Sequence, residues 1–360
     1  LNFKGGKKGG AHALHLPDVS RFQTDNNQAV ITVAAEDAIA CPRYSGLMIR
    51  DIKVEDSPEW LKNKLKSIGI RSINNIVDIT NYVLHELGQP MHAFDAAKIK
   101  DNKVIVKKLK EGSKFITLDG VERILSADDL MICNGQDEPM CIAGVFGGVN
   151  SGVTSETTAI FLESAYFNAG SVRRSSKRHG LKTDASFRYE RGADPNITVY
   201  ALKRAALLIK EIAGGEIASD IIDIYPKKIE NFKVAFSIRS CDDLIGKNLD
   251  IDTIKNIILA LGIEIEQEGN DALLLSVPPF KVDVQREQDV IEEVLRIYGY
   301  NNIEIPSTLH SSLTYGEKPD KERIQHAVSE LLSNNGFSEM MGLSLTKAEY
   351  AGKLSSLHPD

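Results

Sequence analysis

The sequence has four cysteines, and no two of them stand at a CxxC or other metal-site spacing. A zinc protein or a disulfide-rich secreted domain would show such spacing. We therefore expect four buried, reduced thiols in a cytoplasmic protein, namely Cys41, Cys133, Cys141 and Cys241.

Several other signatures are missing. No apolar run approaches the roughly 18 residues of a membrane span, and no signal peptide is visible. The opening KGGKKGG lacks the GxxxxGK[ST] pattern of a phosphate-binding loop, so we interpret it as a linker. No GxGxxG, Ser-His-Asp order or cysteine nucleophile motif stands out. A net charge of -7 argues against a surface that binds nucleic acid everywhere, although a local basic patch remains open.

The 360 residues, 42% hydrophobic and 26% charged, are enough for two or three globular domains. Strand-like segments outnumber helical ones over residues 41–215, which predicts an α+β multidomain fold. A strand–helix–hairpin–helix order over residues 226–304 predicts a second, winged-helix-like α/β domain. The sequence starts without Met and ends soon after a new helix, so we expect residues 1–40 to be a linker and 305–360 a truncated domain.

Residues 70–95, IRSINNIVDITNYVLHELGQPMHAFD, combine many hydrogen-bonding groups with apolar residues at helical spacing. They predict a helix over 74–87, ended by Gly88 and followed by Pro90, with His92 in the loop beyond. Such polar groups must either satisfy each other or line a pocket for a polar ligand.

Two further segments point to the same pocket. The glycines of AGVFGG, residues 143–148, allow a backbone to approach a ligand closely. Glu163 stands among apolar residues in a predicted strand, and a buried acid needs a donor. The alternatives are a salt bridge from Glu163 to Arg71 and a purely structural role for His92.

Residues 173–192, RRSSKRHGLKTDASFRYERG, interleave basic and aromatic side chains. That pattern suits a phosphate backbone with unstacked bases, and a generic charged loop is the alternative. Farther on, Asp289, Glu292 and Glu293 share one helix face, with Asp283 ahead of it. They are candidate Mg²⁺ ligands, and the alternative is a solvated face paired with Arg286 and Arg296.

Four motifs together resemble the bacterial phenylalanine–tRNA ligase β subunit family. They are residues 73–95, AGVFGG, residues 173–192 and DVIEEVLRIYGY at 289–300. The resemblance implies a tRNA-editing domain over 41–215, then the small domain, then the start of a catalytic-like domain. Three departures from the expected pattern are His85, Phe146 and Lys281; Phe146 would reshape the pocket wall.

The resemblance also implies functional residues. In the family, the second pocket hydrolyses tyrosine mis-attached to tRNA, because a phenylalanine site cannot strongly exclude an added hydroxyl. Glu163 with the backbone of Ala143 and Gly144 would read that hydroxyl. The remaining editing-site positions would be Arg71, Thr80, Asn81, His92, Thr183 and Ala185.

The resemblance further implies Mg²⁺ on Asp283, Asp289, Glu292 and Glu293, an α subunit in an α2β2 assembly, and tRNA(Phe), ATP and phenylalanine as ligands of that assembly. We expect no aminoacylation by this chain alone. The alternatives are a stand-alone RNA-binding or deacylating module, and a metal-dependent hydrolase with a cleft around the acidic helix.

Overall fold

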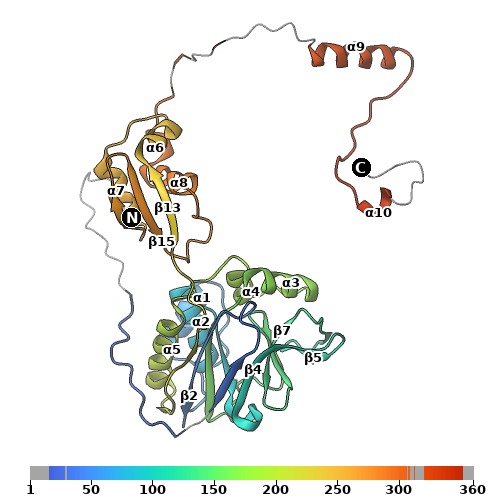
Figure 1. Ribbon diagram of the computed structural model, residues 1–360. Helices are drawn as coiled ribbons and strands as arrows, with labels where there is room; N and C mark the ends of the chain where they lie inside the picture. Colours follow the sequence, from blue (N-terminus) through green and yellow to red (C-terminus); the bar gives the residue numbers. More distant parts are fainter. Residues whose placement is uncertain (1–15, 29–30, 306, 309–311, 313–319, 352–360) are drawn as a thin grey trace. The chain divides into compact units, whose positions relative to one another are not determined.

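The computed structural model describes residues 16–28, 31–305, 307–308, 312 and 320–351 (Figure 1). The chain divides into two compact units, Leu1–Ile303 and Glu304–Asp360, and each is described by itself. The first unit holds three clusters of buried hydrophobic side chains, two between residues 31 and 218 and one between residues 234 and 294. The α+β multidomain architecture expected from the sequence is confirmed.

The first sheet is antiparallel and has the order β11-β2-β10-β3, with β12 also paired to β2. Its strands are β2 (Arg43–Arg50), β3 (Met91–Asp95), β10 (Ala159–Tyr166), β11 (Glu216–Ile217) and β12 (Ile222–Ile224). One face is covered by α1 (Glu59–Ser67), α2 (Asn75–Leu87) and α5 (Thr198–Ile212) (Figure 1).

Alternation along β2 assigns its side chains to two different cores. Leu47 and Ile49 pack in the cluster that contains the three helices, whereas Tyr44 and Met48 pack in the cluster that contains the second sheet. Because both faces of β2 are covered, the strand is a continuous apolar run in the sequence.

The second sheet has the order β1-β4-β7-β8-β9, and its β1–β4 pair is parallel. Its strands are β1 (Thr32–Ala35), β4 (Lys103–Lys108), β7 (Leu130–Asn134), β8 (Pro139–Ile142) and β9 (Phe146–Gly147). Since β1 belongs to this sheet, the domain begins before residue 41, ahead of the boundary expected from the sequence. The KGGKKGG segment lies outside the described residues.

A hairpin of β5 (Lys114–Ile116) and β6 (Glu122–Ile124) and two helices complete this domain. The helices are α3 (Ala169–His179) and α4 (Asp184–Tyr189). They occupy the basic segment for which a charged loop was one alternative. The prediction of a charged loop is wrong. The side chains of Asn168 and Thr183 each cap the start of a helix, and Gly180 lies between the two helices.

The small domain is a three-stranded antiparallel sheet, β13-β15-β14, packed with three helices. Its elements are β13 (Phe232–Ser237), α6 (Ile238–Ile245), α7 (Ile251–Ala260), β14 (Glu264–Glu268), β15 (Ala272–Val277) and α8 (Glu287–Tyr298). The predicted hairpin and its flanking helices are confirmed. The sequence FSIRS, residues 236–240, predicts a strand, but the strand ends at Ser237, whose side chain caps α6 by accepting from Ser240 N.

Short 3₁₀ helices at Ala96–Lys98, Lys100–Asn102 and Tyr300–Asn302 complete the first unit. In the second unit, α9 (Lys321–Asn334) begins at its cap Asp320, and α10 (Ala348–Ala351) follows. Within the described residues, none of the helices has the length and apolar character needed to cross a membrane. The four cysteines are free and buried, as expected.

Two local features around α2 differ from what the sequence indicates. Ser57, directly before Pro58, is a residue type typical of a helix N-cap, but its hydroxyl donates to Asp78 Oδ2 at 2.6 Å, and Pro58 takes the cap position without a side-chain bond. The loop predicted around His92 is strand β3, because Gly88 and Pro90 turn the chain directly into the sheet.

Candidate functional site

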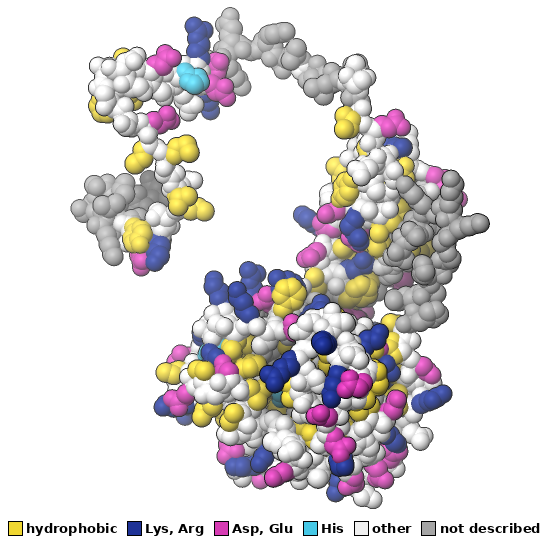
Figure 2. All heavy atoms as spheres, turned by 180° about the vertical axis from the view of Figure 1, so that it is seen from behind, with side chains coloured by type: hydrophobic (Ala, Val, Ile, Leu, Met, Phe, Trp, Pro, Cys, Tyr) yellow, Lys and Arg dark blue, Asp and Glu magenta, His cyan; other side chains and the backbone are white. Residues whose placement is uncertain are grey.

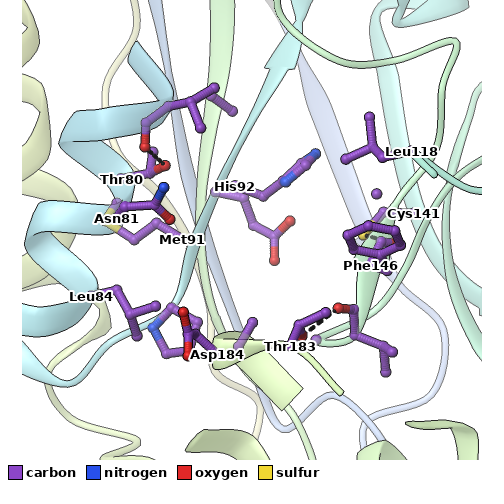
Figure 3. A pocket seen from close by; sticks show the side chains of 18 of the residues that line it. Thr80, Asn81, Leu84, Met91, His92, Leu118, Cys141, Phe146, Thr183 and Asp184 are labelled. Atoms are coloured by element: carbon purple, nitrogen blue, oxygen red, sulfur yellow. Dashed lines mark hydrogen bonds between the residues drawn. The ribbon is translucent and has the colours of Figure 1, made fainter. Parts of the chain in front are cut away.

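A cavity of about 430 Å³ lies between α2, the end of the first sheet and the second sheet (Figure 3). Its size is typical of a small-ligand site. Residues from several distant segments line it. They include Thr80, Asn81 and Leu84 of α2, Met91 and His92 of β3, Leu118, Cys141, Gly144, Phe146, Glu163 of β10, Thr183, Asp184 and Ala185.

Helix α2 presents one side to the core and an adjacent side to the cavity. Ile76, Ile79 and Val83 are buried in the cluster beneath the sheet. Thr80 and Leu84, four residues apart and therefore on one helix face, line the cavity. The Asn74 side chain accepts from Val77 N at 2.9 Å to start the helix. The predicted helix over 74–87 is confirmed.

Strand pairing brings Glu163 beside His92. The two residues are direct partners in the antiparallel β10–β3 ladder, so their side chains lie on the same face of the sheet. Phe161 and Phe94, two residues away on each strand, pack in the core between the sheets. The same alternation therefore directs Glu163 and His92 toward the second sheet and the cavity.

The Glu163 carboxyl is buried without compensation. Its residue is 4% exposed, and among the described residues Oε2 has no hydrogen-bond partner. Burial raises the pKa of Glu163 to about 8. At neutral pH the side chain is therefore mostly a neutral carboxylic acid, which donates one hydrogen bond and accepts others.

The His92 imidazole is buried as well. Its Nε2 has no hydrogen-bond partner within the described part of the chain, and its ring meets Phe94 edge-on with centroids 4.4 Å apart. Burial lowers the pKa of His92 to about 4, so the ring is neutral at pH 7. The cavity floor thus offers two uncharged groups with unused hydrogen-bonding capacity.

The β8–β9 hairpin forms the opposite wall, and a side chain at either of two of its glycines would displace neighbouring atoms. Gly144 has φ 69°, and a Cβ there would stand 2.9 Å from the Tyr189 ring. A Cβ on Gly147 would stand 2.9 Å from His92 Cε1. The backbone therefore approaches both the cavity and His92 as closely as only glycine permits.

The first turn of α4 closes the remaining side. Thr183 accepts from Ser186 N at 3.0 Å in a capping box, and its hydroxyl donates to Val145 O at 2.8 Å. That second bond holds α4 against the β8–β9 turn. Asp184 and Ala185 follow directly and line the cavity.

Cys141 also lines the cavity, but its chemistry does not suit a nucleophile. Burial raises the pKa of the Cys141 thiol well above its usual range. Its Sγ donates to Phe146 O at 3.3 Å. A thiol that stays protonated at neutral pH is unreactive.

The acidic helix α8 has a different character. Asp289 Oδ1 accepts from Arg286 Nη2 at 2.8 Å, and these contacts lower the pKa of Asp289 to about 2. Glu293 is held by Lys281 at 3.2 Å and Arg296 at 3.0 Å. Asp283 and Glu292 are exposed.

These four carboxylates do not form a cation site as they are placed. Over the described residues, no group of three His, Cys, Asp or Glu side chains comes close enough to hold a metal ion. Three cations instead neutralise Asp289 and Glu293, namely Lys281, Arg286 and Arg296. The arrangement matches the solvated, arginine-paired face that was the sequence alternative, and Mg²⁺ binding stays a prediction.

Comparison with known proteins covers both domains of the first unit. Residues 40–214 match the B3/4 domain, and residues 234–300 match the tRNA synthetase B5 domain. The phenylalanine–tRNA ligase β subunit of Bacteroides fragilis is 54% identical over 345 residues, and that of Porphyromonas gingivalis is 50% identical over 355. These alignments cover 96% and 98% of this chain. The chain belongs to the phenylalanine–tRNA ligase β subunit family.

The chain spans 42% and 43% of the length of those two β subunits. The β subunit of Geobacter metallireducens is 41% identical over 91% of this chain. Among solved structures, an N-terminal fragment of the β subunit from Pyrococcus horikoshii covers 77% of each chain at 15% identity, with a TM-score of 0.37.

Seven of the nine editing-site residues that resemblance to the phenylalanine–tRNA ligase β subunits implied line one cavity. They are Thr80, Asn81, His92, Gly144, Glu163, Thr183 and Ala185. Arg71 and Ala143 are outside this lining. Arg71 is exposed in the turn ahead of α2, so the alternative salt bridge to Glu163 is wrong. Ala143 is buried behind Gly144, with its N–H donated to Leu130 O at 2.9 Å.

Other lining residues were not identified from the sequence. Leu118, which follows β5, and Met91 of β3 carry no motif that distinguishes them from core residues. Cys141 was expected only as a buried thiol. Phe146, expected to reshape the pocket wall, does line the cavity.

Three polar residues of the α2 region have structural roles. Asn74 caps the helix. Asn75 donates to Lys53 O at 2.9 Å and accepts from Glu55 N at 3.2 Å. Asp78 accepts from Ser57, Ser72 and Ile73 N.

Proposed function

We propose that this chain serves in charging tRNA with phenylalanine, and that its cavity removes tyrosine attached to that tRNA in error. The first part is supported by relatives of at least 50% identity that are phenylalanine–tRNA ligase β subunits. The second part is supported by the chemistry of the cavity floor.

The observation that carries the editing proposal is the pair of unpaired, uncharged polar groups on the floor of the cavity. Glu163 and His92 are both buried and both lack partners among the described residues. A buried polar atom without a partner is unfavourable, and a ligand hydroxyl placed there would remove the penalty. Tyrosine carries that hydroxyl and phenylalanine does not.

Selectivity for tyrosine follows because only a ligand with a hydroxyl group relieves the unfavourable burial of these polar groups. A pocket built to bind a hydroxyl rejects the analogue that lacks it far more strongly than an apolar pocket rejects an added hydroxyl. In our proposal Glu163, as a neutral acid, donates to and accepts from the tyrosine hydroxyl, and the backbone at Gly144, which lines the cavity, completes its recognition.

The remaining groups would hold the ester and its adenosine. Thr80, Asn81, Thr183 and Ala185 line the walls between the floor and the outside. We propose that a positioned water and the substrate's own hydroxyl carry out hydrolysis, because the cavity thiol of Cys141 is held protonated by burial. No covalent intermediate is required.

Deacylation of tyrosyl-tRNA and phenylalanyl-tRNA by wild type and Glu163→Ala tests this proposal. We expect the variant to lose about 10- to 100-fold on tyrosyl-tRNA, equivalent to the roughly 1–3 kcal/mol of one buried hydrogen bond, and to change little on phenylalanyl-tRNA. Glu163→Gln retains a donor and an acceptor and should keep part of the selectivity. Glu211→Gln, on the exposed surface of α5, is the matched control.

Equal wild-type rates on both substrates would contradict the hydroxyl-reading role. His92→Ala addresses the second group separately. Unchanged deacylation by that variant would remove His92 as a catalytic residue while leaving Glu163 as the selector.

The wider setting follows from the family. We propose that the chain works in the cytoplasm within an α2β2 assembly, in which an α subunit binds ATP and phenylalanine and both subunits contact tRNA(Phe). Aminoacylation is accordingly expected only when the α subunit is added to the full-length β subunit. Charging by this chain alone would contradict that division of labour.

A further inference from the structure

The outer face of α3 is a row of cations on a firmly anchored helix. Its inner face is buried through Ser171, Val172, Ser175 and Ser176. The exposed positions of the following turns are all basic: Arg173, Arg174, Lys177 and Arg178. Lys182 continues the row beyond Gly180, which ends the helix.

Buried contacts fix the position of this helix. The Asp129 carboxylate, fully buried, accepts from Ser175 Oγ at 2.6 Å and from Arg178 Nη1 at 2.7 Å, and it lies 2.7 Å from His179 Nε2. Arg123 of β6 donates to His179 O at 2.7 Å. The cations that point outward therefore stand on a rigid support.

Most of these cations lack acidic partners. Residues 173–191 contain seven Lys or Arg against two acids, although the chain as a whole carries a net charge of -7. Within the described residues, Arg178 pairs with Asp128 and Asp129, and Arg191 pairs with Glu190. Over the same described ranges, no salt bridge involves Arg173, Arg174, Lys177, Lys182 or Arg188.

Like charges three and four residues apart on a helix repel each other. A polyanion laid along α3 would reverse this repulsion. Figure 2 shows Lys and Arg side chains gathered over the region of α3 and α4 on the larger body. The charge is thus concentrated on one surface of a chain whose overall charge has the opposite sign.

This surface leads into the cavity. Thr183, Asp184 and Ala185 line the cavity and follow directly after Lys182. Phe187, one turn into α4, is 50% exposed, with the Arg191 guanidinium 3.6 Å from its ring centre. An exposed aromatic ring in this basic segment provides a stacking surface for a base near contacts for phosphates.

We propose that the outer face of α3, together with Lys182 and Phe187, binds the phosphate backbone of the RNA whose acylated end enters the cavity. This proposal rests on the editing function proposed above. An acidic protein would match the charge alone, whereas RNA matches the charge, the exposed aromatic ring and the position at the cavity entrance.

The test compares two double variants with the same change of charge in the full-length protein. Lys177→Gln/Lys182→Gln alters the proposed surface. Lys64→Gln/Lys66→Gln alters two exposed lysines of α1 and is the control. Hydrolysis of tyrosyl-tRNA is measured between about 50 and 200 mM salt, where phosphate contacts dominate the salt dependence. Hydrolysis of tyrosyl-adenosine, which has no phosphate, is measured in parallel.

We expect the α3 variant to raise KM for tyrosyl-tRNA several-fold and to reduce the slope of log(kcat/KM) against log salt by about 1.4–1.8, the contribution of two phosphate contacts. Its rate on tyrosyl-adenosine should equal that of wild type. The control should match wild type on both substrates.

An unchanged KM and salt slope would overturn the proposal. An acidic protein would then be the better candidate partner for this surface. A loss on tyrosyl-adenosine as large as that on tyrosyl-tRNA would also overturn it, because the lysines would then act through the cavity. If wild type does not prefer tyrosine, the editing function fails. Binding of uncharged tRNA(Phe), with the same variants and salt series, then tests the surface alone.

Discussion

Two buried carboxyl groups in the same domain have opposite surroundings. Asp78, near the start of α2, is fully buried and accepts hydrogen bonds from Ser57 Oγ at 2.6 Å, from Ile73 N at 2.8 Å and from the Ser72 hydroxyl. Glu163, on β10, is 4% exposed, and its buried Oε2 has no partner in the described part of the chain.

The difference separates structure from function. The bonds to Asp78 join the segment before α1, the turn before α2 and α2 itself, so that carboxylate stabilises the fold. By contrast, the Glu163 carboxyl does not join other segments among the described residues, and it faces a cavity. A buried polar group without a hydrogen-bond partner is unfavourable, so its presence indicates a ligand that supplies the missing hydrogen bond.

Matched amide substitutions give the largest expected contrast. Asp78→Asn should lower the free energy of unfolding by about 2–3 kcal/mol, because an amide cannot satisfy three donors as a carboxylate does. Glu163→Gln should change it by less than about 0.5 kcal/mol near pH 4, below the unfolded-state pKa of 4.5, where both side chains are mostly neutral in the folded and the unfolded chain. Urea unfolding of both variants checks this. Equal losses would show that Glu163 has a structural partner.

Per pH unit, the pH dependence should be the next largest effect. Burial raises the folded-state pKa of Glu163 from 4.5 to about 8. Between these values the folded protein retains a proton that the unfolded chain has released, so this group makes stability fall as pH rises. The stability of Glu163→Gln relative to wild type should therefore increase by up to about 1.4 kcal/mol per pH unit across this window.

His92 provides the internal control with the opposite sign. Its folded-state pKa is lowered from 6.5 to about 4, so protonation of the unfolded chain removes stability as pH falls through that window. His92→Gln should lose this dependence at low pH and keep that of Glu163 at high pH. A relative stability of Glu163→Gln that stays constant from pH 5 to 8 would contradict the raised pKa.

The acidic helix α8 should give the smallest effect. Asp289 accepts from Gln285 N at 3.1 Å and Arg286 N at 2.9 Å at the helix start, so Asp289→Ala should cost about 1 kcal/mol, as for other lost helix-start contacts. Because Arg286 already neutralises Asp289, we expect Mg²⁺ to shift the unfolding midpoints of wild type and variant equally.

A Mg²⁺-dependent rise confined to wild type would show that the carboxylates leave their cationic partners to bind the ion. Calorimetric unfolding with and without Mg²⁺ distinguishes the two outcomes. The same measurement shows whether the carboxylates of α8 resemble Asp78, whose hydrogen-bond partners lie within the chain, or Glu163, whose partner would be a ligand.

Local chemistry explains which elements the sequence predicts well. The α2 boundaries follow from Asn74 and Gly88, whose capping geometries depend only on neighbouring backbone. The loop expected at His92 failed because pairing with β10, some 70 residues later, made residues 91–95 a strand. The start of α6 is set locally instead, because the Ser237 side chain caps the helix by accepting from Ser240 N.

By itself, the sequence determined the capped helices, the apolar strands and, through motif resemblance, which residues to examine. Only the tertiary structure decided that Glu163 and His92 are strand partners, that Asp78 is satisfied where Glu163 is not, and that Arg71 stays outside. The reason is physical: spacing along a chain sets local hydrogen bonds, whereas burial, and the pKa shifts that burial causes, depend on segments that meet only after folding.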